Sequence, residues 1–432
     1  MLARCRAPLA ALLCTLACCS PHALHAGDWP HWRGPSRDGI ADESSGFGGK
    51  TWHLEQAWSA DVGEGSSSPI VAGGRVYTIG NARGRDVVRC LDLETGKTLW
   101  AIDYPCPSYG RKARGDQGIY RGTSSTPAYD PATGLLFTLS IDGDLHCWDA
   151  NQRGAKRWHI NLYEKYDPPV RPKVNRSGHR DYGYTTSPLV IGDWAIVEVG
   201  GKSGNTIAFD KQTGRQVWAS ENRDPAGHTG GVVPITVEGV PCLAMLTHFN
   251  LLVMRIDQGR AGQTVAEYPW LTEFANGIAT PAVQDQYVLI TSGYNHQKMC
   301  KLEVTLRGAK KLWQRDVYSK VCSPVIHKGH IYWSWRDVYC LDFETGRQVW
   351  KGPSGLGDPG SCIVTADDRL IVWSNEGTLL LMDTAARSPE APNVLYRRDR
   401  IFRTDAWPHV VLAGNRLLCK DRDGNFKCFK IN

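Results

Sequence analysis

The sequence predicts an all-β protein: an eight-bladed β-propeller of four-stranded antiparallel blades, closed by a strand from the N-terminal end. Three observations predict this fold. A hairpin pattern, Asp-x-x-Thr-Gly-x-x-x-Trp, occurs three times along the chain. Eight strand starts, most of them a Ser/Thr-Pro pair, recur at intervals of one blade. One further aromatic residue, Trp58, precedes the first unit and supplies the eighth outer strand.

The first 26 residues have the composition of a secretory signal peptide. Arg4 and Arg6 precede the apolar run Ala7–Cys19, which is too short to span a bilayer, and small Ala26 ends the segment. A lipoprotein signal with Cys18 as the acylated residue is the alternative. No later segment of the sequence is long and apolar enough to cross a membrane. The sequence therefore predicts an extracytoplasmic protein, periplasmic or secreted, with a leader at residues 27–55 and the propeller at 56–432.

The three strict copies of the hairpin pattern begin at Asp92, Asp210 and Asp342. In such a turn Asp accepts local backbone hydrogen bonds, Thr closes the turn and Gly takes the positive φ. The aromatic residue that ends each unit is expected to dock the outer strand against the neighbouring blade. The docking set comprises Trp58, Trp100, Trp158, Trp218, Tyr268, Trp313, Trp350 and Tyr396. Because Trp29 lies in the leader, its replacement is expected to cost less stability than that of Trp218.

The strand starts are the second repeated feature. Proline at the first residue of a strand removes only a donor that the ladder does not need. These prolines are Pro69, Pro127, Pro188, Pro234, Pro281, Pro324 and Pro408, and Cys362 occupies the remaining place.

Ten of the fourteen cysteines remain after the signal peptide, and export permits disulfides. Cys90, Cys147 and Cys340 occupy one repeated slot, which indicates a small buried residue. Cys322 and Cys362 fall near the same inner position of neighbouring repeats, so they are the candidate disulfide.

The hairpin units, the strand starts and the eightfold count resemble the pyrroloquinoline-quinone-like (PQQ-like) propeller repeat. The segment GDWPHWRGPSRDGI (Gly27–Ile40) resembles the leader of secreted bacterial proteins that carry such propellers. The resemblance implies the fold of quinoprotein alcohol dehydrogenases, and it raises the alternative of a PQQ-dependent oxidoreductase with calcium. The sequence departs from that pattern: its only adjacent cysteines, Cys18 and Cys19, lie in the signal peptide. No calcium-ligand cluster, metal-binding histidine spacing or catalytic motif is evident, so no catalytic or metal residue is assigned.

Two long connections interrupt the regular spacing. Residues 106–122 carry a net charge of +3 and residues 163–182 a net charge of +2, which accounts for the basic excess of the chain that follows the signal peptide. As consecutive connections of one type they are expected to lie side by side on one face of the ring. The candidate binding face comprises Arg111, Lys112, Arg114, Arg121, Lys165, Arg171, Lys173, Arg176, His179 and Arg180. These cations are expected to be exposed, so replacing them should leave stability nearly unchanged. Solvated loops that only aid solubility are the alternative.

The sequence thus favours an exported, non-catalytic binding or scaffolding module. An envelope protein or an acidic glycan is the expected partner, and nucleic acid is not expected. No cofactor is expected unless PQQ with calcium binds, and a monomer is expected.

Overall fold

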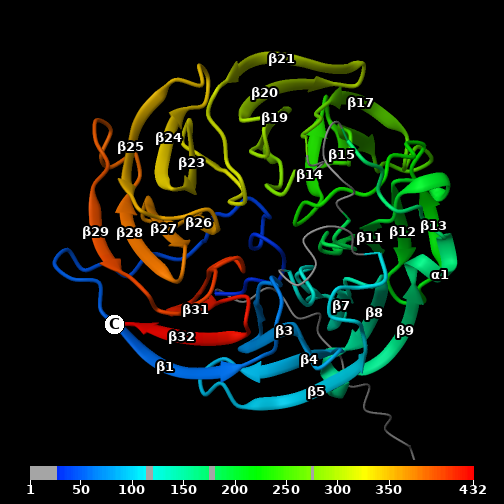
Figure 1. Ribbon diagram of the computed structural model, residues 1–432, viewed down its shortest axis with the longest axis horizontal. Helices are drawn as coiled ribbons and strands as arrows, with labels where there is room; N and C mark the ends of the chain where they lie inside the picture. Colours follow the sequence, from blue (N-terminus) through cyan, green and yellow to red (C-terminus); the bar gives the residue numbers. More distant parts are fainter. Residues whose placement is uncertain (1–26, 113–119, 175–180, 274–276) are drawn as a thin grey trace, which may run out of the picture.

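The computed structural model describes residues 27–112, 120–174, 181–273 and 277–432. Eight four-stranded antiparallel sheets are arranged around a central axis (Figure 1). The predicted eight-bladed β-propeller is therefore confirmed. In the described residues no helix is both long and apolar enough to span a membrane.

Each blade runs from an inner strand at the axis to an outer strand at the rim. Blades 1–4 consist of β2 (Ile70–Ala72), β3 (Arg75–Ala82), β4 (Arg85–Asp92), β5 (Thr98–Pro105); β6 (Ala128–Asp130), β7 (Leu135–Leu139), β8 (Asp144–Asp149), β9 (Ala155–Asn161); β10 (Leu189–Ile191), β11 (Trp194–Glu198), β12 (Thr206–Asp210), β13 (Gln216–Ala219); and β14 (Val233–Val237), β15 (Val240–Leu246), β16 (Asn250–Arg255), β17 (Thr264–Pro269). Blades 5–8 consist of β18 (Ala282–Gln284), β19 (Tyr287–Ser292), β20 (Lys298–Thr305), β21 (Gly308–Arg315); β22 (Val325–His327), β23 (His330–Trp335), β24 (Asp337–Asp342), β25 (Gln348–Ser354); β26 (Gly360–Val364), β27 (Arg369–Ser374), β28 (Thr378–Asp383), β29 (Val394–Arg398); and β30 (Val411–Ala413), β31 (Arg416–Lys420), β32 (Asn425–Ile431), β1 (Leu54–Asp61). One short α-helix, α1 (Leu162–Tyr166), and two 3-10 turns, η1 (Ala150–Gln152) and η2 (Gly201–Ser203), complete the described elements.

The ring closes in the last blade, where β1 pairs antiparallel with the C-terminal strand β32. Trp58 of β1 lies opposite Cys428 of β32. This pairing joins the two ends of the propeller and removes the exposed strand edges that would otherwise invite aggregation. β1 begins at Leu54, two residues before the propeller boundary expected from the sequence.

The tryptophan of the preceding blade packs against the repeated hairpin. The Asp92 carboxylate accepts hydrogen bonds from the backbone N–H and the hydroxyl of Thr95, at 2.8 and 2.7 Å. Gly96 follows at φ +69°, and a Cβ there would approach the Trp58 ring to 2.6 Å. The Trp58 indole N–H then donates to the carbonyl of Leu93 at 2.8 Å. The glycine therefore adopts the turn conformation and, because it has no side chain, lets the ring pack directly against the backbone.

The same docking recurs at other blade junctions. Gly154, Gly214 and Gly346 lie against Trp100, Trp158 and Trp313 respectively. The indoles of Trp158 and Trp313 donate to the carbonyls of Lys211 and Phe343, which are equivalent to Leu93. Trp218, Trp350 and Tyr396 lie on the outer strands β13, β25 and β29.

Blade 4 differs from the blades of Trp100 and Trp218 in the position of its aromatic residue on the outer strand. Trp100 and Trp218 lie opposite Cys90 and Ala208, four residues after the hairpin glycine. In blade 4 that slot belongs to Ala266, which follows Gly262 by four residues and lies opposite Val253. Tyr268 lies two residues farther along β17, opposite Leu251, and packs against the hydrophobic cluster formed by residues of blades 4 and 5.

The Ser/Thr-Pro strand starts link adjacent blades around the axis. The backbone N–H of Ser68 donates to the hydroxyl of Thr126, and Thr126 N–H donates to the hydroxyl of Ser187. Thr280 N–H binds the Ser323 hydroxyl in the same way. Each hydroxyl thus satisfies a buried amide of the neighbouring blade, which would be costly to leave unpaired.

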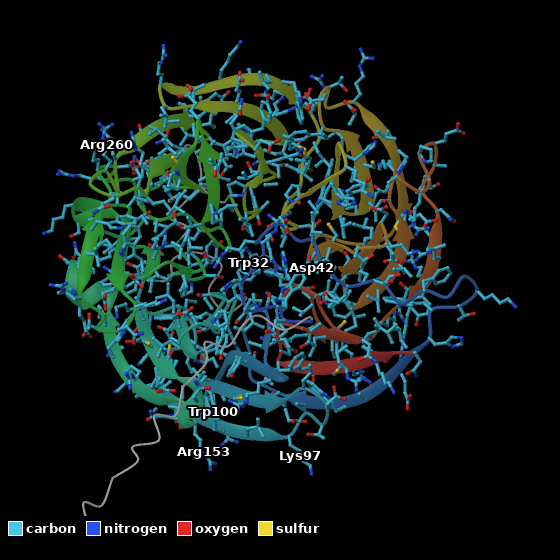
Figure 2. All side chains as sticks on the ribbon, turned by 180° about the vertical axis from the view of Figure 1, so that it is seen from behind. Trp32, Asp42, Lys97, Trp100, Arg153 and Arg260 are labelled. Atoms are coloured by element: carbon cyan, nitrogen blue, oxygen red, sulfur yellow. The ribbon has the colours of Figure 1, made fainter. Side chains whose placement is uncertain are left out.

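The leader crosses the axial end of the ring and contacts every blade. Figure 2 shows Trp32 near the centre of the ring, whereas Trp100 lies at its rim. The contacts, in blade order, are Trp29 with Val71, Pro30 with Tyr129, Arg37 with Val190, Trp32 with Gly230 and Gly231, Arg33 with Pro281 and Pro324, Ala41 with Val364, and Gly27 with Gly414. Trp29 and Trp52 are buried in the hydrophobic core of blades 7, 8 and 1.

A buried lysine lies at the junction of blades 8 and 1. The ammonium group of Lys420 donates to the carbonyls of Gly65 and Ser67, at 3.0 and 2.9 Å. Burial lowers the pKa of Lys420 to about 7, although the neighbouring Asp421 opposes the shift. In the unfolded chain the pKa of lysine is about 10.4, so between these values the unfolded state binds more protons.

Above the unfolded pKa, Lys420 is uncharged in both states and its burial carries no protonation cost. As pH falls from there to about 7, the unfolded state gains a proton that the folded state lacks, so the free energy of unfolding decreases. Between pH 7 and 8.5 the wild type is expected to gain about 1–2 kcal/mol relative to Lys420→Met, at up to about 1.4 kcal/mol per pH unit. Urea unfolding of both proteins at the two pH values measures the difference, and the comparison cancels the titration of the other groups. Parallel pH profiles for the two proteins would contradict the assignment.

Candidate binding site at the propeller axis

The two long connections lie side by side on one face of the ring. Arg111 of the first connection pairs with Asp142 at 3.1 Å and with Glu164 of the second connection at 3.6 Å. The Lys112 ammonium group lies 5.3 Å from the centre of the Tyr163 ring. Tyr120 and Tyr182 meet edge to face with ring centres 5.6 Å apart. These contacts join the two connections above the axis.

The candidate cations differ in their surroundings. Arg121 bonds the Tyr109 hydroxyl and pairs with Glu64 at 3.4 Å. Lys165 lies over the rings of Tyr166 and Phe209, and Lys173 is exposed. Arg114, Arg176, His179 and Arg180 lie outside the described residues.

Arg171 is not an exposed cation, contrary to the sequence-based expectation. Its side chain is 4% exposed and pairs with Asp181 at 2.6 Å. It also donates to the carbonyls of Ala226 and Gly227, which lead into blade 4. Burial alone would raise the pKa of Asp181, but the Arg171 charge and two backbone N–H groups bring that pKa below its usual range. Arg171 therefore tethers the second connection to the body of the propeller.

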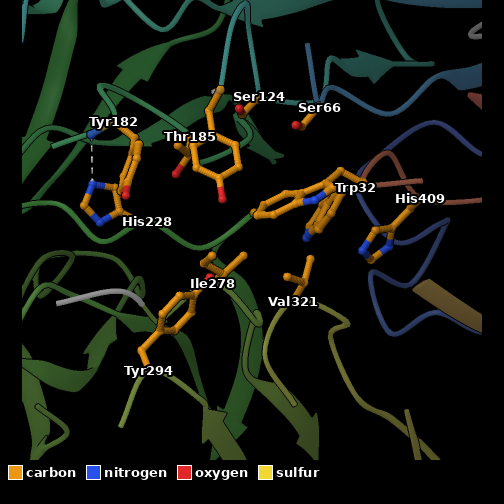
Figure 3. Close-up of a pocket in the computed structure, with 13 residues that line it drawn as sticks. Trp32, Ser66, Ser124, Tyr182, Thr185, His228, Ile278, Tyr294, Val321 and His409 are labelled. Atoms are coloured by element: carbon orange, nitrogen blue, oxygen red, sulfur yellow. Dashed lines mark hydrogen bonds between the residues drawn. The ribbon is translucent and has the colours of Figure 1, made fainter. Parts of the chain in front are cut away.

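A pocket opens on the same face at the axis (Figure 3). Its volume is about 110 Å³. The lining residues come from the connections and from the strand starts of successive blades: Trp32, Ser66, Tyr120, Ser124, Tyr182, Thr185, His228, Gly230, Ile278, Tyr294, Val321, Trp407 and His409.

The two sides of this axial pocket differ in polarity. Ser66, Ser124 and Thr185 contribute hydroxyls from the starts of blades 1, 2 and 3, whereas Ile278 and Val321 contribute aliphatic groups from blades 5 and 6 (Figure 3). Consecutive blades lie side by side in a ring, so the hydroxyls and the aliphatic groups occupy opposite sides.

Aromatic rings form the floor and the rim of the pocket. Trp32 inserts from the leader, its indole N–H bonded to the Thr280 hydroxyl at 3.2 Å and its ring 4.1 Å from that of His409. Tyr120 contacts Trp407 at the rim, with ring centres 5.4 Å apart. The Arg422 guanidinium lies 5.1 Å from the Tyr120 ring centre, at the margin of the pocket.

The ionisable side chains of the described pocket wall, apart from its tyrosines, are two histidines, His228 and His409. The residues that line it include no Asp, Glu, Lys or Arg. Burial, and next the positive charge of Arg33, lower the pKa of His409 to about 3. The His409 imidazole therefore carries no charge near neutral pH.

The described lining does not fit PQQ with calcium. PQQ is a tricyclic tricarboxylate, and calcium takes oxygen ligands that commonly include carboxylates. The described lining offers no carboxylate to the metal ion and no Lys or Arg to the carboxylates of the quinone, and the Arg422 guanidinium lies only at the margin of the pocket, beside Tyr120. Over the described part of the chain, no group of three or more His, Cys, Asp and Glu side chains is arranged to hold a metal ion.

The candidate disulfide partners lie close to each other near the leader. The sulfur atoms of Cys322 and Cys362 are 3.7 Å apart, and both residues are present as free, buried thiols. The two cysteines are therefore adjacent, but no disulfide bond joins them.

Spacing in the sequence could have located the pocket. Ser66, Ser124, Thr185, Ile278 and Val321 each stand three residues before a strand-start proline. Because the inner strands surround the axis, this one position per blade converges there.

A family model described as "Outer membrane protein assembly factor BamB" matches residues 84–352, more than half of the chain. The chain belongs to this family. The family is one of PQQ-like β-propeller proteins, which confirms the resemblance seen in the repeats.

Members of this family and its quinone-dependent relatives both match in sequence. The assembly factor BamB of Burkholderia pseudomallei is 26% identical over 44% of this chain and 52% of its own length. The dehydrogenase subunit of a quinone alcohol dehydrogenase from Gluconobacter oxydans is 27% identical over 46% of this chain. The chain spans about a quarter of the length of that subunit.

Solved structures share the fold at low sequence identity. BamB from Moraxella catarrhalis has a TM-score of 0.59 and 15% identity, covering 88% of this chain and all of its own. Quinohemoprotein alcohol dehydrogenase from Comamonas testosteroni has a TM-score of 0.64 and 13% identity, covering 94% of this chain and 80% of its own.

Proposed function

We propose that this protein is an exported, non-catalytic propeller that binds a partner of the cell envelope. The binding surface is the face formed by the two connections and the axial pocket. The observation that carries the proposal is the pocket itself: it is aromatic, its described lining contains no Asp, Glu, Lys or Arg, and it is open on the face where the two long connections meet. Such a wall suits binding by stacking and hydrogen bonding.

The family supports an envelope protein as the partner, because its description names outer-membrane assembly. The exposed or partly exposed lysines of the connections, Lys112, Lys165 and Lys173, supply positive charge beside the pocket. Charges of this kind act mainly on the rate of encounter and on salt-sensitive affinity. An acidic surface on the partner fits them.

A PQQ-dependent oxidoreductase is the second candidate, favoured by the sequence match to the quinone dehydrogenase subunit. The absence of Asp, Glu, Lys and Arg from the described pocket lining argues against it. If the quinone binds the folded protein, saturating PQQ with calcium should raise the melting temperature by mass action.

Co-sedimentation with purified envelope membranes tests the binding proposal. A Lys112→Ser, Lys165→Ser, Lys173→Ser variant is expected to sediment less than the wild type at low salt. The difference should shrink as added salt shortens the Debye length below about 8 Å. Arg171 is retained in this variant because it is buried.

The matched control replaces Lys97, Arg215 and Arg347 with serine. These residues are exposed at the hairpins before β5, β13 and β25, at the opposite end of the outer strands from the connections. The control should sediment like the wild type. An equal loss of sedimentation in both variants would show that the net charge of the protein, and not this face, determines membrane binding. If the wild type does not sediment with the membranes, the envelope partner is rejected.

A further inference from the structure

The axial pocket has a polar side and an apolar side, which restricts the ligand it can take. Thr185 donates its hydroxyl proton to the Thr229 carbonyl at 3.2 Å, so its oxygen retains only acceptor capacity toward the pocket. No hydrogen bond joins the Ser66 or Ser124 hydroxyl to another described residue. Both serines can therefore donate and accept. Ile278 and Val321 offer only van der Waals contact on the opposite side.

The volume of the pocket restricts the size of the ligand. A cavity of about 110 Å³ is somewhat smaller than the engineered cavity of about 150 Å³ that binds benzene. One six-membered ring with a small substituent fits such a space, with part of the substituent in the open mouth. A tricyclic quinone is larger than this space and would extend into the open mouth.

The charge of the pocket restricts the ligand further. Transferring a carboxylate or ammonium group to an aromatic wall without Asp, Glu, Lys or Arg side chains carries a large desolvation cost. Five aromatic residues, Trp32, Tyr120, Tyr182, Tyr294 and Trp407, instead offer ring faces and edges for stacking. An uncharged aromatic ring satisfies both conditions.

We propose that the axial pocket binds an uncharged, single-ring aromatic group with one hydrogen-bonding edge, of the phenol class. The hydrogen-bonding edge faces Ser66, Ser124 and Thr185, and the hydrocarbon edge faces Ile278 and Val321. This inference rests on the binding face of the proposed function and names the chemistry of its central pocket. A free phenolic molecule and a tyrosine side chain of a partner protein both present this chemistry.

Ligand-observed NMR titration of the full mature protein tests the proposal with three matched probes: p-cresol, toluene and 4-methylbenzoate. p-Cresol is expected to bind with a Kd on the order of 1 mM, as suits a ligand of this size. Toluene, which lacks the hydroxyl, should bind about five-fold more weakly because one hydrogen bond is lost. The anionic 4-methylbenzoate should bind more weakly than either.

A Ser66→Ala, Ser124→Ala variant separates the polar side from the rest of the pocket. It should lose most of the preference for p-cresol over toluene and retain the affinity for toluene. Ser59→Ala, on the exposed outer strand β1, is the control and should behave like the wild type. Tighter binding of 4-methylbenzoate, no saturable binding of p-cresol by the wild type, or an unchanged preference in the double variant would overturn the proposal.

Two further measurements distinguish a free phenol from a tyrosine side chain as the ligand, and the phenol site from the envelope partner. Acetyl-Gly-Tyr-Gly-amide should bind more tightly than p-cresol if a partner polypeptide supplies the ring, and more weakly if a free phenol does. Envelope co-sedimentation in the presence of saturating p-cresol reports on the proposed function separately. If membranes do not bind the protein while p-cresol still does, only the envelope partner is rejected.

Discussion

Replacing Arg171 with alanine is expected to lower the free energy of unfolding by about 3–5 kcal/mol, because the change leaves Asp181 buried without its cation. Asp181 is 1% exposed and lies 2.6 Å from the guanidinium. The substitution also removes the two hydrogen bonds to the Ala226 and Gly227 carbonyls. Urea unfolding at pH 7 measures the loss. Because Tyr182 follows Asp181 and lines the axial pocket, p-cresol binding should weaken in the same variant.

Two controls separate the buried ion pair from a general loss of positive charge. Arg121→Ala removes an exposed arginine from the first connection and should leave the free energy of unfolding nearly unchanged. The double variant Arg171→Met, Asp181→Leu removes both charges and should recover a large part of the stability, since a hydrophobic pair can replace a buried ion pair. If Arg171→Ala unfolds like Arg121→Ala, the side chain is not the tether that the geometry indicates.

The number of blades and the closure by β1 could be predicted because each blade repeats local signals. Asp92, Thr95 and Gly96 fix a turn through hydrogen bonds within four residues, so the pattern is readable from the chain alone. Blade 4 shows the limit of the pattern: Ala266 stands four residues after Gly262, where the strict motif has tryptophan, and the aromatic residue of this strand is Tyr268, two residues farther along.

The residues that form the axial site could not be predicted in the same way. Trp32 reaches Thr280 across 248 positions of sequence, and no local pattern specifies such a contact. Likewise, the formal charge of Arg171 gives no sign of its burial, which depends on Asp181 and on two carbonyls from blade 4. Charge counts located the two connections but did not distinguish exposed cations from buried ones.

Trp29→Ala is expected to lower the free energy of unfolding by about 3–5 kcal/mol, and more than Trp218→Ala, which reverses the order expected from the sequence. Trp29 is 2% exposed, its ring lies against Gly34, and its backbone exchanges two hydrogen bonds with Val71 of β2, at 2.7 and 2.9 Å. Trp218 remains partly exposed on the outer strand β13, so its truncation returns less apolar surface to water. The physical difference is position: the leader covers the axial end where all eight inner strands converge, whereas β13 lies at the rim. Guanidinium unfolding of both variants measures the order. A smaller loss for Trp29→Ala than for Trp218→Ala would show that the leader packs on a propeller that is already stable without it.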